Sequence, residues 1–155
     1  MGAHQTFQVD LRGMVDLLAR HLYSGPRVYV RELLQNAVDA VTARREVEPD
    51  APATVRIVVH PDGPVGAPGV ICLDVTDSGI GLDRAQATEL LATIGRSSKR
   101  DETFGLGREQ YIGQFGIGML AAFMVAQEIE VTSRSAAPGA VPVHWRGYED
   151  GTFET

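Results

Sequence analysis

Apolar residues recur at three- and four-residue intervals in two stretches near the start of the chain. These positions are Leu11, Met14, Leu17, Leu18 and Leu22, and then Val30, Leu33, Leu34, Ala37 and Val41. Because this interval is the period of an α-helix, the pattern predicts helices over residues 11–22 and 26–46. Pro26 suits the first turn of the second helix, where an N–H group has no partner within the helix.

Four later stretches have the pattern of β-strands. Residues 54–60 place three β-branched apolar side chains on one side of an extended segment. Residues 70–75 are mostly apolar and predict a central strand. Residues 128–134 and 141–146 are separated by a Pro138-Gly139 turn, so they predict an antiparallel hairpin.

Two more helices complete the predicted elements. Asp83, with Gln86 three residues later, resembles a capping box and predicts a short helix that ends near residue 94. Residues 119–126 are apolar on every side, which predicts a helix buried within the domain. Helices and strands are mixed without a strict alternation. The predicted class is therefore α+β, a two-layer sandwich with a mostly antiparallel sheet and helices on one face.

Composition narrows the range of functions. The chain has 155 residues, of which 44% are apolar and 22% charged, as expected of one globular domain over residues 1–155. Its apolar runs are too short to cross a membrane. The single cysteine, Cys72, fits a reducing cytoplasm, and we expect a cytoplasmic location. A net charge of -6 argues against nucleic-acid binding. The 17 glycines exceed what turns alone require.

The second predicted helix carries polar residues with a shared direction. At about 100° per residue, Glu32, Asn36 and Asp39 fall in a narrow stripe opposite the apolar positions. A carboxamide one turn from a carboxylate suits Mg²⁺, which prefers oxygen ligands and keeps several waters. The carboxylate could then orient an attacking water. The alternative is an ordinary solvated polar face.

Two glycine-containing loops offer places for a nucleotide. In the first, residues 77–81, Asp77 follows a strand and could accept from the amino group of a base, although an Asx turn or helix cap explains it equally well. In the second, residues 113–118, the glycines let N–H groups converge on a phosphate at a helix start, unless they form only a flexible loop. Their spacing differs from the Rossmann and P-loop patterns. Residues 95–112, before this loop, are long enough for a lid.

Three blocks together resemble the ATP-site motifs of the Bergerat-fold ATPases. The blocks are Arg31-Glu32-Leu33-Leu34-Gln35-Asn36-Ala37-Val38-Asp39-Ala40, Asp77-Ser78-Gly79-Ile80-Gly81 and Ile112-Gly113-Gln114-Phe115-Gly116-Ile117-Gly118. Within that superfamily the chain is most similar to the N-terminal domain of the ninety-kilodalton heat-shock chaperones. The resemblance extends from Thr6 to the end of the chain, and three motifs in order are far more specific than any one of them.

The resemblance implies a role for each matching residue. Glu32 would be the general base, Asn36 would coordinate Mg²⁺, and Asp77 would accept from the adenine amino group. The other residues implied near ATP or ADP are Asp39, Gly79, Gly81, Leu82, Arg96, Gly113, Gln114, Phe115, Gly116, Ile117, Gly118 and Met119. Residues 95–118 would form the lid.

The expected function is ATP binding and hydrolysis, weak in the isolated chain, by the N-terminal domain of a stress-response chaperone that assists protein folding. Client proteins and a homodimer would involve the full-length protein, with neither nucleic acid nor membrane as a partner. Leu90 stands where the chaperones usually have an asparagine, and the sheet strands that end this domain in the family are missing. The alternatives are a nucleotide-sensing module without hydrolysis, a histidine kinase or a topoisomerase-type ATPase.

Overall fold

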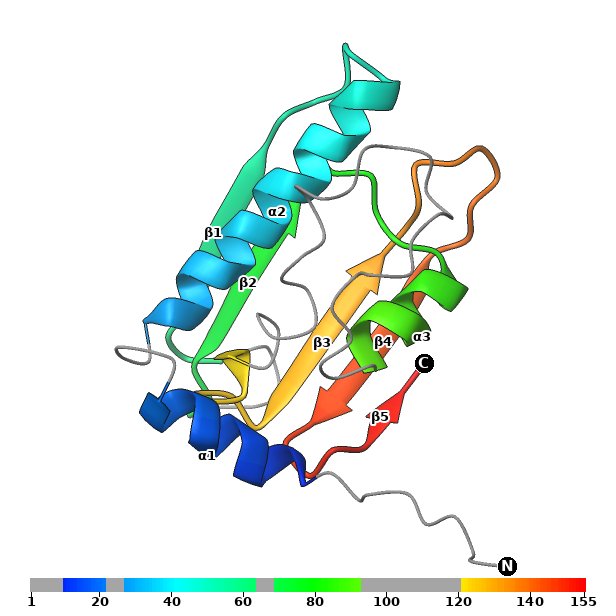
Figure 1. Cartoon of the computed structure of the whole chain (residues 1–155). Helices are drawn as coiled ribbons and strands as arrows, with labels where there is room; N and C mark the ends of the chain where they lie inside the picture. The colour runs from blue at the N-terminus through cyan, green and yellow to red at the C-terminus, as the bar shows by residue number, and fades with distance from the viewer. Residues whose placement is uncertain (1–9, 22–26, 64–68, 93–120) are drawn as a thin grey trace, which may run out of the picture.

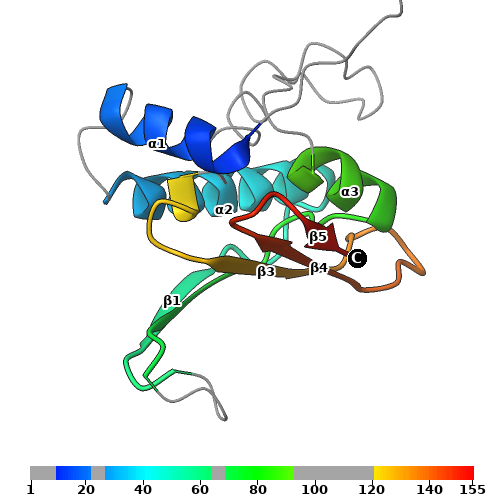
Figure 2. The same cartoon turned by 90° about the horizontal axis from the view of Figure 1, so that it is seen from below.

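A computed structural model of the chain describes residues 10–21, 27–63, 69–92 and 121–155 (Figure 1). Its helices and strands are α1 (Leu11–His21), α2 (Val28–Val47), β1 (Val55–His60), β2 (Cys72–Asp77), α3 (Arg84–Ala92), β3 (Glu128–Ser133), β4 (Val143–Tyr148) and β5 (Phe153–Glu154). Seen from below, the three helices lie on one side of β1, β3 and β4 (Figure 2). The predicted two-layer α+β class is confirmed.

The strands form two antiparallel groups. In the first, β1 pairs with β2 so that Val55 lies opposite Asp77 and His60 opposite Cys72. In the second, the order is β3-β4-β5, and the predicted hairpin over residues 128–146 is confirmed. Within the described ranges, β2 and β3 run beside each other without pairing (Figure 1). The two groups are joined by the loop that follows β2.

The strand predicted over residues 70–75 is present but lies two residues further along the chain, and among the described residues it is not central. The strand β2 begins at Cys72 and ends at Asp77, and within the part of the chain that the structure describes it pairs with β1 alone. Val70 and Ile71 precede it and are exposed. The length of β2 is set by its six-residue partner, which pairs as far as Asp77. An apolar run carries no information about that register.

Trp145 is the centre of the core under α3. It is buried together with Val143 of β4 and Ala87 of α3, and Leu82 packs against this cluster. Alternate residues of β4 point to the other face of the sheet, as a strand with one solvated face requires. There Arg146 forms ion pairs with two glutamates of β3. The core therefore fixes α3 against β4, and with it the loop between β2 and α3.

The start of α3 is the predicted capping box. The backbone N–H of Gln86 donates to Asp83 Oδ1 at 2.8 Å, and the backbone N–H of Asp83 donates to Gln86 Oε1 at 2.9 Å. Two N–H groups that lack partners within the helix are satisfied in this reciprocal way. The box ends the loop after β2 at a defined residue.

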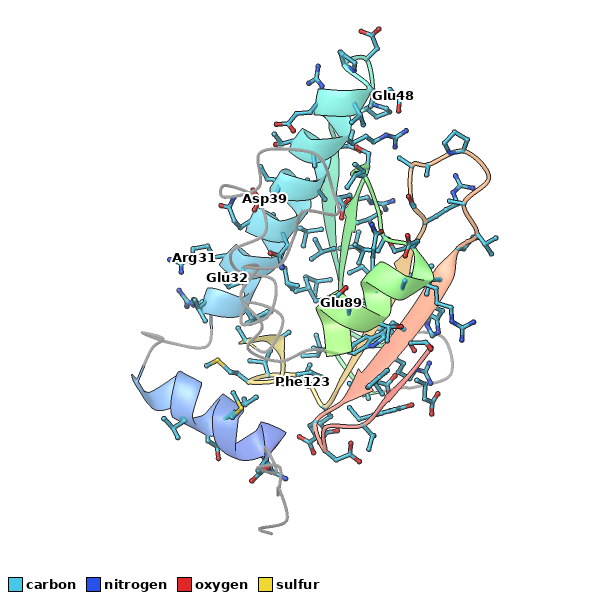
Figure 3. The ribbon with its side chains drawn as sticks, turned by 45° about the vertical axis from the view of Figure 1, so that its right-hand side comes forward. Arg31, Glu32, Asp39, Glu48, Glu89 and Phe123 are labelled. Carbon is cyan, nitrogen blue, oxygen red and sulfur yellow. The ribbon has the colours of Figure 1, made fainter. Side chains whose placement is uncertain are left out.

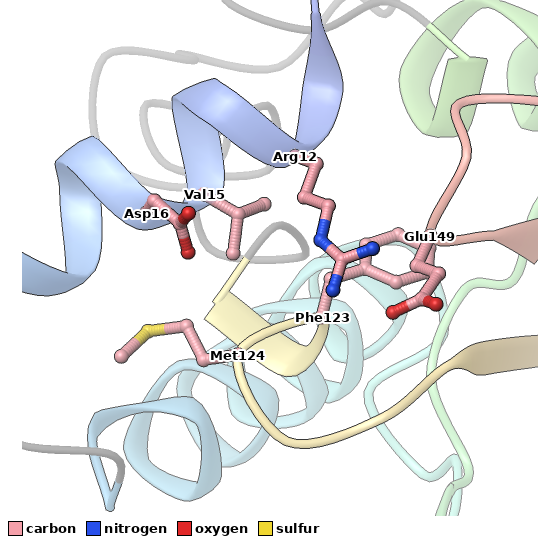
Figure 4. A pocket seen from close by; sticks show the side chains of 6 residues that line it. All are labelled: Arg12, Val15, Asp16, Phe123, Met124 and Glu149. Carbon is pink, nitrogen blue, oxygen red and sulfur yellow. The ribbon is translucent and has the colours of Figure 1, made fainter.

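Residues 119–126 are described only from Ala121 onward. Ala121 and Ala122 are helical and buried, whereas residues 123–125 form a turn and Val125 is exposed. The helix therefore ends before the predicted boundary, and its last predicted turn is not buried. Between this segment and α1 lies a cavity of about 240 Å³ (Figure 4). Its lining is formed by Arg12, Val15, Asp16, Phe123, Met124 and Glu149.

Within the described ranges, each helix is too short or too polar to cross a membrane.

Candidate nucleotide site

The inward face of α2 brings two polar side chains into the protein. Glu32 is 6% exposed and Asn36 is 8% exposed, and both are buried along with Ala37 and Val41. The polar stripe lies opposite the apolar positions as predicted, because Glu32 and Val41 are 180° apart around the helix, but the protein covers both sides. The buried positions span about half of the helix circumference at 100° per residue, and Glu32 and Asn36 lie at one margin of that half. A solvated polar face is therefore excluded for these two residues.

Glu32 has a charged neighbour at the protein surface (Figure 3). Arg31 Nη2 donates to Glu32 Oε1 at 3.1 Å, and the Arg31 side chain is 75% exposed. Solvent screens an ion pair with one such partner, so it contributes little to stability. It does, however, orient the Glu32 carboxylate and leave Oε2 without a side-chain donor among the described residues.

Asn36 has an unsatisfied donor. Its Nδ2 atom is buried, and no described residue accepts a hydrogen bond from it. A buried polar group without a partner costs about 1–3 kcal/mol, so such atoms are rare unless a ligand or water satisfies them. Asp39, one turn further along, is half-buried and accepts from Gln35 Nε2 at 2.8 Å. Asn36 thus offers a buried donor on α2 to an oxygen atom of a ligand or a water.

Asp77 ends β2 and begins the nucleotide loop, which we define as residues 77–82. The backbone N–H of Gly79 donates to Asp77 Oδ1 at 2.8 Å, and this is the Asx turn considered from the sequence. Within the described part of the chain the turn uses only Oδ1, so Oδ2 can accept from a ligand. The residue as a whole is solvent-accessible. Even so, partial burial of its carboxyl group raises the pKa of Asp77, and the Gly79 hydrogen bond partly offsets the rise.

Close backbone approach places the nucleotide loop against α2. A Cβ atom added to Gly79 would lie 2.5 Å from Ala40 Cβ, so only glycine fits there. The N–H of Ile80 donates to the Ala40 carbonyl at 2.9 Å. The small residues of α2 thus let the loop lie against the inward face of the same helix that carries Glu32 and Asn36.

The other end of the loop is fixed to the second group of strands. The backbone N–H of Leu82 donates to Ser133 Oγ at 2.9 Å, and the N–H of Ala136 donates to the Ile80 carbonyl at 2.7 Å. Gly81 has a φ of +67°, a conformation that favours glycine. The loop therefore joins the two groups of strands. Leu82, predicted beside the base, packs against the Trp145 cluster.

Several predicted residues lie outside the described residues. They are Arg96, Gly113, Gln114, Phe115, Gly116, Ile117, Gly118 and Met119, together with the predicted lid over residues 95–118. The nucleotide loop, with Asp77 and Gly79, contacts α2 at Ala40, on the helix that carries Asn36 and Glu32 one and two turns earlier. Sequence reasoning missed Arg44, whose Nη1 donates to the Ser78 carbonyl at 3.2 Å. In the sequence, Arg44 is recognisable only as a basic residue near a helix end, and such a residue ordinarily interacts favourably with the helix dipole.

The raised pKa of Asp77 predicts how its replacement changes stability with pH. A carboxyl group with a raised pKa contributes stability below its unfolded pKa, and loses it as the pH rises through the folded pKa. Asp77→Asn keeps an oxygen for the Gly79 N–H and carries no charge. We expect its free energy of unfolding in urea to equal or exceed that of wild type at pH 7. The difference should shrink as the pH falls through the raised pKa of folded Asp77 and should be lost below about 4, the ordinary aspartate pKa. Lower stability of the variant at pH 7 would contradict this assignment.

One family and several curated proteins match this chain. Residues 23–141 match the family described as histidine kinase-, DNA gyrase B-, and HSP90-like ATPase. The chaperone protein HtpG of Actinobacillus succinogenes is 35% identical over 95% of this chain and 24% of its own length. The mitochondrial heat shock protein 75 kDa of Bos taurus is 34% identical over 96% of this chain and 22% of its own length. HtpG of Cupriavidus metallidurans is 34% identical, over 97% and 25% respectively. The chain thus spans about a quarter of these curated relatives.

Proposed function

Because the chain belongs to the family of histidine kinase-, DNA gyrase B- and HSP90-like ATPases, we propose that it binds and hydrolyses ATP as the nucleotide-binding domain of a molecular chaperone. The observation that carries the proposal is the burial of Glu32 and Asn36 one turn apart on α2, with Asn36 Nδ2 unsatisfied. Membership of the family by itself supports ATPase activity as the class of reaction. The two buried polar side chains support a ligand at this face of α2.

The nucleotide loop would bind the base. Asp77 Oδ2 accepts from the adenine amino group, while Oδ1 stays bound to the Gly79 N–H. A purine with a carbonyl group in that position would present an acceptor to a carboxylate, which is unfavourable. Gly79 and Gly81 let the loop backbone pack closely against Ala40 and Arg134, which fixes the loop that would bind the base. Leu82, whose side chain packs against the Trp145 cluster, is proposed to end that binding loop. This geometry makes adenine the preferred base.

The phosphate end would involve α2 and the second glycine loop. Asn36 would bind Mg²⁺ through its carboxamide oxygen, because Mg²⁺ prefers oxygen ligands and takes few protein ligands beside waters and phosphates. Its unsatisfied Nδ2 is a donor and would bond to an oxygen of the ligand rather than to the metal. In the described residues no group of three or more His, Cys, Asp or Glu is placed to hold a metal, so the phosphates would supply further ligands. A bound Mg²⁺ neutralises charge that develops on the phosphates. Arg96 and residues 113–119 are proposed to contact the phosphates, with Asp39 behind Asn36.

Glu32 is proposed as the general base. Its carboxylate lies in a buried position one turn before Asn36, where it can orient a water in line with the γ-phosphate and accept a proton from it. The Arg31 ion pair holds Oε1, so Oε2 is the atom that would accept the proton. Most of the rate acceleration would come from positioning and charge neutralisation, as in other phosphoryl transfers.

Titration calorimetry with Mg-ADP tests the proposed function. We expect wild type to bind ADP and Asp77→Asn to bind it about 10- to 100-fold more weakly, because a hydrogen bond to a charged acceptor contributes about 1.5–3 kcal/mol. Thermal unfolding of both proteins controls for folding. Equal affinities would show that Asp77 does not bind the base. A wild-type protein that binds neither ADP nor ATP would exclude the proposed function.

The proposal extends to the whole protein through the names of its relatives, which are chaperones and heat shock proteins. We propose a role in protein folding under stress, in the cytoplasm, with client proteins and a homodimer contacted by the full-length protein. Residues 1–155 would be one nucleotide-binding domain with its lid over residues 95–118.

Two alternatives are separated by simple assays. A nucleotide sensor would bind ADP but release no phosphate from ATP. A histidine kinase would become labelled when incubated with ATP that carries a labelled γ-phosphate, whereas the proposed ATPase would release the label into solution.

A further inference from the structure

Ser78, in the nucleotide loop, is held through all of its polar groups. Its N–H donates to the Thr54 carbonyl at 3.0 Å, and its hydroxyl donates to the Pro52 carbonyl at 2.7 Å and accepts from the Thr54 N–H at 2.9 Å. Its own carbonyl accepts from Arg44 Nη1 at 3.2 Å. Ser78 is thus a fixed point between α2, the segment before β1 and the loop that carries Asp77.

The guanidinium group of Arg44 is held in an orientation that lets it donate to the Ser78 carbonyl. Its side chain is only 27% exposed, which is low for an arginine. Both Nε and Nη2 donate to Glu48 Oε2 at 3.2 Å. Two bonds to one carboxylate oxygen fix the plane of the guanidinium group, so Nη1 is aimed at Ser78 rather than left free to rotate.

The Ser78 carbonyl and the Gly79 N–H belong to the same peptide group. Because a peptide group is planar and trans, fixing the direction of its carbonyl also fixes the direction of its N–H. That N–H is the donor to Asp77 Oδ1, at 2.8 Å. A contact of Arg44 with one side of this peptide therefore determines the orientation of the Asp77 carboxylate on the other side.

We propose that Arg44 is a positioning residue of the nucleotide site, which sets the Asp77 carboxylate through the Ser78–Gly79 peptide. The inference rests on the proposed function, because Asp77 is the residue that would bind the base. Arg44 itself touches no nucleotide. Its effect is on the choice of base and on affinity, through the geometry of the Asp77 carboxylate.

The competing explanation is that Arg44 only stabilises the end of α2. An arginine in the last turn interacts favourably with the helix dipole, and a pair four residues apart adds a little more. Arg45 provides a matched control, because its Nε donates to the Pro49 carbonyl at 3.2 Å beyond the same helix end. Arg45→Met removes the same charge from the same turn and leaves the Ser78 carbonyl contact in place.

The experiment compares ADP with inosine diphosphate, which carries a carbonyl oxygen where adenine has its amino group. We expect wild type to prefer ADP. Arg44→Met should lower ADP affinity about tenfold, the effect of one hydrogen bond from a charged donor, while inosine diphosphate affinity changes little. The ratio of the two affinities should therefore fall. Arg44→Lys, which keeps a donor but not the double contact with Glu48, should restore part of the ratio. Arg45→Met should match wild type.

Each other outcome decides against the proposal in a different way. Equal losses for both nucleotides in Arg44→Met, or the same losses in Arg45→Met, would reduce Arg44 to a helix-stabilising residue. An unchanged ratio in Arg44→Met would overturn the positioning role while ADP binding by wild type still supports the proposed function. If wild type binds neither nucleotide, the proposed function fails and the positioning role fails with it. If Arg44→Met does not fold, Arg44→Lys and Glu48→Gln provide the same comparison, with an intermediate fall in the ratio expected for each.

Discussion

Glu32→Gln is expected to lower phosphate release at saturating Mg-ATP by about 100- to 10,000-fold, the range for loss of a general base. ADP affinity should stay close to that of wild type. The amide has the size of the carboxylate, so it should occupy the same buried position beside Asn36, but it cannot accept a proton from the attacking water. Steady-state phosphate release and calorimetry with ADP measure the two quantities separately.

Glu46→Gln is the matched control for this variant. Glu46 lies on the same helix and undergoes the same change of charge, but it is exposed. Its turnover and affinity should equal those of wild type. If Glu32→Gln turns over ATP as fast as wild type, Glu32 is not the base. A parallel loss of ADP affinity would instead indicate that Glu32 supports the binding site rather than the chemical step.

The elements that sequence predicted best are those encoded by neighbouring residues. The capping box of Asp83 and Gln86 formed as expected, because both partners lie within one helical turn. The hairpin of β3 and β4 followed from two alternating strands and a Pro-Gly turn. By contrast β5, which has only two residues, is too short to show any periodicity. Local patterns therefore predicted the main elements and missed the short pairing at the edge.

The polar stripe of α2 shows a different limit. Helical periodicity gives the angle between Glu32 and Ala37, but it does not say how much of the helix circumference the protein covers. The structure buries about half of it, so Glu32 and Asn36 are buried at one margin although they lie opposite Val41. Their proposed chemistry is compatible with either arrangement. Only the buried one explains why Asn36 has an unsatisfied donor.

The supports of the nucleotide loop were not predictable from local pattern. Arg44 and Ser78 are separated by 34 positions, and Ser133 and Leu82 by 51. Asp77 itself was found because a carboxylate after a strand and before glycines is a local signal. The residues that orient it come from segments whose own sequences show only a helix end and a strand end. Long-range contacts of this kind require the fold.

Gly81→Ala is expected to lower the free energy of unfolding by about 3 kcal/mol or more, and ADP affinity with it. The reason is a combination of two effects at one position. Gly81 has a φ of +67°, which strains any residue with a side chain, and an added Cβ would clash with the carbonyl oxygen of Arg134. Relief requires the nucleotide loop to move away from the end of β3 and the turn after it, which breaks the hydrogen bonds of Leu82 with Ser133 and of Ile80 with Ala136.

Gly139→Ala separates the two effects, because Gly139 has a similar φ of +75° but nothing within 4 Å of an added Cβ. It should cost about 1 kcal/mol, the strain of the left-handed conformation alone, and leave ADP affinity unchanged. Urea unfolding of both variants gives the difference, which is the contribution of close approach between the loop and the turn. If the two variants lose equal stability, residues 134–136 can shift at little cost, and their contact with the nucleotide loop does not stabilise the loop. If Gly81→Ala loses stability but binds ADP as wild type does, the geometry of Asp77 depends on α2 and Arg44 and not on the second group of strands.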